Sequence, residues 1–123
     1  MPIFVVQFHR AKTDHYDFRL ESGGSLKSWA VPKIPPLKKG VKRLAIQVED
    51  HAKSYANFQG EIEEGYGKGT VRIWDNGNYS LKEKTPTKLV FVLQGKIMKG
   101  EYALVKTSFG RNPEKTWLLM KIK

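Results

Sequence analysis

The chain has 123 residues and no cysteine, so disulfide bonds and thiolate zinc sites are excluded, and we expect a single domain over residues 1–123. Its formal net charge is +10, from 22 Lys and Arg against 12 Asp and Glu, and 40% of its residues are hydrophobic. This composition argues against a disordered chain and makes nucleic acid the first partner to consider, although a lysine-rich surface can also serve solubility alone.

The clearest element is the alternating segment "HYDFRLE" at residues 15–21. Its period of two creates an apolar face and a polar face, which carry Tyr16, Phe18 and Leu20 and, opposite them, His15, Asp17, Arg19 and Glu21. The segment is therefore predicted to be a half-buried strand, and a β-branched and aromatic strand precedes it at residues 3–8. The sequence "SGG" at 22–24 predicts a hairpin turn, in which glycine readily adopts positive φ, leading into a strand at 26–31.

The rest of the chain continues as short strands separated by glycine, proline or charged turns. Further strands are predicted at residues 44–49, 70–75, 79–83, 88–95, 101–108 and 116–123. Residues 50–58 are irregular with one helical turn, residues 60–69 form a tight exposed loop, and "NGN" at 76–78 is a hairpin turn. No window has helical periodicity, so the expected fold class is mainly β. Among such folds, a compact antiparallel β-barrel of about eight strands with short helical turns is favoured, with a sandwich as the alternative.

The polar face of residues 15–21 carries the candidate chemistry. His15 and Asp17 point the same way, and the loop at 10–14 can fold His9 back toward them. Two imidazoles and a carboxylate suit manganese, iron or zinc better than calcium or magnesium, which prefer all-oxygen shells. The alternative is a set of solvated residues on an exposed strand face, because this spacing alone has many chance matches.

Neighbouring residues favour an anionic substrate at such a metal site. Arg19 follows along the same face, and a guanidinium matches the oxygens of a phosphate. His51 lies in the irregular segment, and Tyr55 follows four residues later. This spacing fits a general acid, or a hydrogen-bond donor to phosphate, beside a second polar group. Arg43 begins the preceding strand and can reach the same pocket, although in isolation it is typical of a surface cation.

Two other functions remain open at this stage. The H-x-D spacing at 15–17 with a distant His51 matches iron oxygenases on β-barrel folds, but that interpretation leaves His9 and Arg19 without a role. A basic β-barrel that binds nucleic acid without catalysis is the other alternative. Exposed aromatic stacking platforms would favour it, whereas the aromatic residues of 15–21 lie on the apolar face.

Several long stretches of the chain resemble one known family. The stretches are "FVVQFHRAKTDHYDFRLE", "LKSWAVPK", "KRLAIQVEDHAKSYANFQGEIEEGYGKGTVRIWD" and the terminal "WLLMKIK". They are similar to the 3'-phosphoesterase domain of bacterial DNA ligase D and its free-standing archaeal and bacterial relatives, almost end to end. The resemblance implies a β-barrel that trims the 3' ends of DNA primer-templates. Such a domain removes a terminal ribonucleoside by a phosphodiesterase step and then the 3'-phosphate, which leaves a 3'-OH.

The resemblance also implies a site, a metal and partners. The implied metal ligands are His9, His15 and Asp17. The residues that look like the phosphate-gripping and catalytic ones are Arg19, Arg43, His51 and Tyr55. Mn²⁺ is the typical metal, and Co²⁺ or Zn²⁺ also suits such ligands. The implied partners are DNA or RNA/DNA primer-template 3' ends, in repair or non-homologous end joining, with a separate DNA ligase and polymerase alongside.

The start of the chain adds two expectations. Family members within DNA ligase D carry a longer N-terminal arm with polar residues that assist the diesterase step, so the sequence predicts the monoesterase activity more strongly than the diesterase activity. The opening "MPIFVVQF" has no basic region followed by a long apolar run, and no later segment approaches the roughly 18 apolar residues of a membrane span. We therefore expect a soluble, cytoplasmic monomer without a membrane partner.

Overall fold

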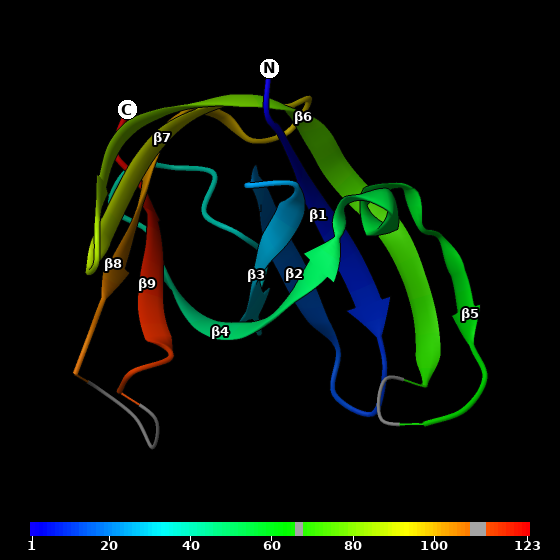
Figure 1. The fold of residues 1–123 in the computed structure, drawn as a ribbon. Helices are drawn as coiled ribbons and strands as arrows, with labels where there is room; N and C mark the ends of the chain where they lie inside the picture. The colour runs from blue at the N-terminus through cyan, green and yellow to red at the C-terminus, as the bar shows by residue number, and fades with distance from the viewer. Residues whose placement is uncertain (66–67, 109–112) are drawn as a thin grey trace.

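The computed structural model describes residues 1–65, 68–108 and 113–123, and Figure 1 shows a curved sheet that closes on itself. Its elements in chain order are β1 (Ile3–Arg10), β2 (His15–Ser22), β3 (Ser25–Val31), β4 (Lys42–Ala52), the 3₁₀ turn η1 (Lys53–Asn57), β5 (Gly60–Ile62), β6 (Gly69–Thr85), β7 (Lys88–Gln94), β8 (Lys99–Lys106) and β9 (Thr116–Lys121). No helix in these ranges is long and apolar enough to cross a membrane.

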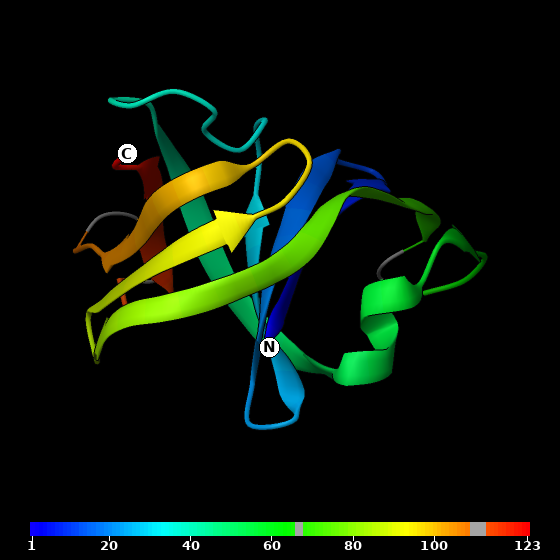
Figure 2. The same cartoon turned by 90° about the horizontal axis from the view of Figure 1, so that it is seen from above.

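Eight of these strands form a closed antiparallel barrel. The order around the sheet in the described part of the chain is β1-β2-β3-β4-β9-β8-β7-β6, and β6 pairs with β1 to close the ring. The short strand β5 extends the sheet beyond β6. Figure 2 shows β5 and η1 together on the side of the molecule away from the tip of the β6–β7 hairpin. The prediction of an antiparallel β-barrel of about eight strands with short helical turns is confirmed.

The barrel interior is filled by the inward-facing residues of the strands. Phe18 of β2 is fully buried and packs with Trp29 and Phe91, at ring-centroid distances of 6.4 and 5.8 Å. Leu20 is buried in the same cluster, and Tyr16 packs against its edge. Burying each such side chain stabilises the fold by about 1.5–3 kcal/mol. The apolar face predicted for residues 15–21 is therefore the core face of β2.

The structure corrects the prediction for residues 76–78. These residues do not form a hairpin turn, because they lie inside the continuous strand β6. The first half of β6 pairs with β1 and the second half with β7, so the strand changes partner near Asn78. A Cβ on Gly77 would clash with the carbonyl oxygen of Gln94. The glycine here permits a close approach between strands, not a turn.

Other boundaries agree in part with the sequence predictions. The glycines at 23–24 have φ of 61° and 84° and form the predicted turn between β2 and β3. His51 was expected in an irregular segment but lies on β4, which is longer than predicted. Part of the predicted loop at 60–69 is strand, since Gly60–Ile62 pairs with β6. Residues 66–67 of that loop lie outside the described residues.

Candidate active site

A polar cluster lies on the outer face of the β1–β2 hairpin. Antiparallel pairing sets His9 opposite His15 and Gln7 opposite Asp17. Because side chains alternate along a strand, His15, Asp17 and Arg19 share the outer face while the apolar residues between them face the core. Strand pairing alone therefore collects two imidazoles, a carboxylate and a guanidinium in one place.

His9, His15 and Asp17 are close enough to hold one metal ion. Their ligand atoms all lie within 4.8 Å of one another. His15 Nε2 is 3.3 Å from Asp17 Oδ1, and His9 Nδ1 is 3.8 Å from Asp17 Oδ2. His15 Nδ1 lies 3.0 Å from the Thr13 carbonyl oxygen. A neutral imidazole would donate its proton there, which leaves the Nε2 lone pair on the side of Asp17.

The chemistry of this donor set fits a transition metal. Two imidazole nitrogens and one carboxylate suit manganese, iron, cobalt or zinc, whereas calcium and magnesium prefer oxygen ligands alone. The pKa of His15 is raised mainly because the protonated imidazole can donate a hydrogen bond to the Asp17 carboxylate. Within the described ranges the close group includes His9 and leaves out His51, so the triad expected for an iron oxygenase is not the group that forms.

Arg19 is held in place by three polar partners. Its Nε donates to Gln7 Oε1 and its Nη1 donates to Ser28 Oγ, each at 2.7 Å. Nη2 lies 3.4 Å from Asp17 Oδ2. Only 3% of Arg19 is exposed, and this burial lowers the pKa of its guanidinium. A guanidinium carries five N–H bonds, so this fork retains donors that an anion can use.

Gln7 joins this arginine to the turn η1. Its Oε1 accepts the bond from Arg19, while its Nε2 donates to the carbonyl oxygens of Tyr55 at 2.8 Å and Phe58 at 3.2 Å. The side chain is fully buried. One amide therefore fixes both the guanidinium and η1. Gln7 is not among the site residues predicted from the sequence, although alternation along β1 puts it on the same face as His9.

His51 of β4 and Tyr55 of η1 stack against each other beside Arg19. Their ring centroids are 4.5 Å apart with an interplanar angle of 24°, and the Arg19 guanidinium lies 5.0 Å from the Tyr55 ring centroid. Tyr55 stacks in turn on Phe58. Burial lowers the pKa of His51, with a further contribution from Arg19, and burial raises the pKa of Tyr55. Both groups thus favour their neutral forms, in which each can donate a hydrogen bond.

Arg43 is the predicted residue that the structure does not bring into this cluster. It lies at the opposite end of β4 from His51, and its Nε donates to the Ile34 carbonyl oxygen at 2.7 Å. Ala45, two residues on, is fully buried, so alternation assigns Arg43 to the core-facing side of β4. Six of the seven predicted residues therefore meet, and a phosphate contact at Arg43 stays a prediction.

Comparison with known proteins matches the chain to one family. Residues 7–106 match the family model described as "DNA Ligase D 3'-phosphoesterase domain". A protein of Pseudomonas aeruginosa named "Multifunctional non-homologous end joining protein LigD" is 45% identical over 126 residues, and one of the same name from Mycobacterium bovis is 43% identical over 125. The alignments cover 98% of this chain but only 15% and 16% of those relatives. The chain is thus similar to a small part of each.

Proposed function

The chain belongs to the DNA ligase D 3'-phosphoesterase domain family, whose name implies a hydrolase, and from this premise we propose that it removes phosphate from the 3' ends of DNA in a metal-dependent reaction. The product is a 3'-OH, which a ligase or polymerase of repair or end joining can use. Removal of a 3'-terminal ribonucleoside by a diesterase step is part of the same proposal. The observation that carries it is the convergence of His9, His15 and Asp17 beside the buried Arg19.

His9, His15 and Asp17 would hold the metal, which we propose to be Mn²⁺, with Co²⁺ or Zn²⁺ compatible with the same donors. A metal bound there would neutralise the charge that develops on a phosphate oxygen during attack by water. The Thr13 carbonyl orients the imidazole of His15, and Arg19 lies against the carboxylate of Asp17. Such outer partners hold the donor atoms in position before a metal arrives.

Arg19 would bind the phosphate itself. Gln7, Ser28 and Asp17 fix its guanidinium, and the remaining N–H bonds are available to phosphate oxygens. Because the fork is already immobile, little side-chain entropy is lost when substrate binds. Arg43 is the second phosphate contact of the proposal, and it would have to exchange its present bond to the Ile34 carbonyl.

His51 would donate a hydrogen bond or a proton to the phosphate or its leaving oxygen, and Tyr55 would position the same group. The stacking of the two rings supports this pairing, since it holds His51 against Tyr55, whose ring lies beside the Arg19 guanidinium. The lowered pKa of His51 favours the neutral imidazole at pH 7, in which one ring nitrogen still carries a donor proton.

The test uses a 5'-labelled primer, annealed to a template, that ends in either a 3'-phosphate or a single ribonucleotide. With Mn²⁺ we expect conversion of the first to a 3'-OH end, and of the second through a 3'-phosphate to a 3'-OH end. EDTA should stop both reactions. A protein that binds the primer without metal and releases no phosphate with it would instead be the basic nucleic-acid-binding β-barrel.

A further inference from the structure

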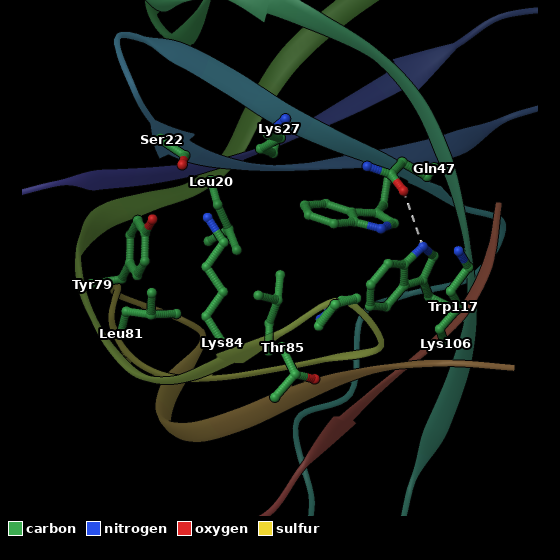
Figure 3. A pocket seen from close by; sticks show the side chains of 13 residues that line it. Leu20, Ser22, Lys27, Gln47, Tyr79, Leu81, Lys84, Thr85, Lys106 and Trp117 are labelled. Carbon is green, nitrogen blue, oxygen red and sulfur yellow. Dashed lines mark hydrogen bonds between the residues drawn. The ribbon is translucent and has the colours of Figure 1, made fainter. Parts of the chain in front are cut away.

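A cavity opens into the barrel interior on the other side of β2 from the metal cluster. It has a volume of about 280 Å³ and lies between β2, β3, β4 and β9 on one side and the β6–β7 hairpin on the other (Figure 3). Leu20 lines it, whereas the preceding residue Arg19 contacts the outer cluster. A molecule in this cavity would therefore be separate from one at the phosphate site.

The inner wall of the cavity is aromatic. Trp29 and Trp117 meet edge to face, with ring centroids 6.0 Å apart and an interplanar angle of 83°. Figure 3 shows Tyr79 on the opposite side of the cavity from Trp117. Leu89 adds a further apolar surface. Flat rings on two sides suit a flat ligand, and a volume just below the roughly 300 Å³ of the smallest drug-sized pockets suits a small one.

The polar lining of the cavity is cationic. Lys27, Lys84 and Lys106 line it, and none of the described aspartates or glutamates does. Lys27 pairs with Asp50 at 3.2 Å, whereas the side chains of Lys84 and Lys106 have no hydrogen bond or ion pair with any described residue. Figure 3 shows Lys84 extending from the β6–β7 hairpin toward Leu20, and Lys106 on the other side of the cavity, beside Trp117. Lysines without acidic partners along a cavity attract an anion.

The wall also contains a buried donor without an acceptor. Trp117 Nε1 donates to Gln47 Oε1 at 3.1 Å, but Trp29 Nε1 is buried and has no hydrogen-bond partner among the described residues. A buried donor left in this state destabilises a protein by about 1–3 kcal/mol. An acceptor that enters the cavity, with a small shift of the surrounding side chains, would recover part of that free energy.

We propose that this cavity binds a nucleotide, with the base against the tryptophans and the phosphate at Lys106, which lies beside Trp117 (Figure 3). The base supplies a flat apolar ring and an acceptor for Trp29 Nε1, and the phosphate supplies the anion. A fatty acid would satisfy the apolar wall and the lysines but not the indole N–H, and an inorganic anion would satisfy the lysines alone. The site goes beyond the proposed hydrolysis, because β2 contributes Leu20 to it from the face opposite the metal cluster.

The nucleotide can be free or can be an unpaired residue of a nucleic-acid strand, and the experiment separates these sources. The full chain with Trp74→Phe keeps two tryptophans, both in the cavity wall, so its fluorescence reports on the cavity. It is titrated in EDTA with thymidine monophosphate and with an oligonucleotide of six thymidines. We expect saturable quenching. Equal affinity for the two indicates a free nucleotide, and much tighter binding of the oligonucleotide indicates a strand. Calorimetry on the unmodified chain repeats the measurement if Trp74→Phe unfolds.

Matched variants test the lysines. Lys106→Glu should weaken binding by roughly tenfold, because it replaces a charge-assisted contact by repulsion. Lys99→Glu makes the same charge change at the other end of β8 and should alter the affinity less than about threefold. His15→Ala removes a residue of the metal cluster and should bind the nucleotide as the parent does. That variant makes a failure of this proposal distinguishable from a failure of the proposed hydrolysis.

Three results would overturn the proposal: no saturable signal with either ligand, equal weakening by the two lysine variants, or binding of laurate or of inorganic phosphate as tight as that of the nucleotide. Trp29→Phe supplies a further check. It keeps an apolar ring and removes the N–H donor, so nucleotide affinity should fall while laurate, which offers the cavity no acceptor near that ring, should be unaffected.

Discussion

Neighbouring residues of β2 face opposite environments. Phe18 and Leu20 point inward, where apolar side chains surround them and burial needs no compensation. Asp17 and Arg19 point outward and are almost as buried, but each is held by polar partners. Burying a charge without such partners would be strongly unfavourable. The inner face of the strand therefore stabilises the fold, whereas the outer face holds a prearranged charged site whose burial costs some of that stability.

The largest effect should come from the inner face. Phe18→Ala leaves a void in the fully buried core and is expected to lower the free energy of unfolding by about 3–5 kcal/mol, measured by urea denaturation. Phosphate release per folded molecule should stay within about threefold of the parent, because Phe18 does not face the cluster. Leu44→Ala, at a residue 42% exposed, is the matched control and should change stability by less than about 1 kcal/mol. Similar losses in the two variants would contradict the comparison.

The outer face should show the opposite pattern. His15→Ala is expected to lower Mn²⁺ affinity by at least about 100-fold, since even the outer partners of a metal site contribute roughly 10- to 100-fold. The metal-free protein should keep its stability within about 1 kcal/mol, because the side chain is partly exposed. Calorimetric Mn²⁺ titration and urea denaturation check the two parts. A metal affinity that survives the change would remove His15 from the site.

Arg19→Lys tests whether phosphate binding requires the forked geometry of the guanidinium or only its positive charge. An ammonium group cannot reproduce the geometry that contacts Gln7, Ser28 and Asp17 together, so kcat/KM for the 3'-phosphate is expected to fall by about 10- to 100-fold. Arg10→Lys makes the same change at an exposed residue of β1 and should leave kcat/KM within about twofold. Equal behaviour of the two variants would show that Arg19 contributes charge alone.

The smallest effect concerns a polar group of the interior. Tyr102 is fully buried, its hydroxyl donates to the Pro36 carbonyl, and burial raises its pKa to about 12. The unfolded phenol ionises near 10, so between pH 10 and 12 the unfolded state binds fewer protons and stability falls as pH rises, by on the order of 2 kcal/mol. Stability curves across that range should be flatter for Tyr102→Phe. Parallel curves would contradict the assignment.

The parts of the fold and site that depend on local sequence pattern could be predicted. The alternation of residues 15–21 separates core from site because strand side chains change face at every residue. The same alternation predicts that His15, Asp17 and Arg19 share one face. His9 lies opposite His15 because a short loop joins β1 to β2.

Features that depend on pairing between distant strands could not be predicted from the sequence. The "NGN" at 76–78 has the local preference of a turn, but β6 pairs first with β1 and then with β7, and this partner change cannot be read from the segment itself. Arg43 shares a strand with His51, yet a strand of 11 residues carries them to opposite ends. The role of Gln7 depends on the carbonyl groups of Tyr55 in η1 and of Phe58 just after it, which no spacing in the sequence indicates.

The most direct test of the account compares phosphate release by the parent and by Asp17→Asn on a primer that ends in a 3'-phosphate, with Mn²⁺ and with EDTA. The substitution preserves shape and removes the charge that His9, His15 and Arg19 surround. We expect Mn²⁺-dependent release by the parent, and a reduction of at least about 100-fold in a variant that remains folded. Undiminished release by Asp17→Asn, or release by the parent in EDTA, would contradict a metal-dependent site on the outer face of β2.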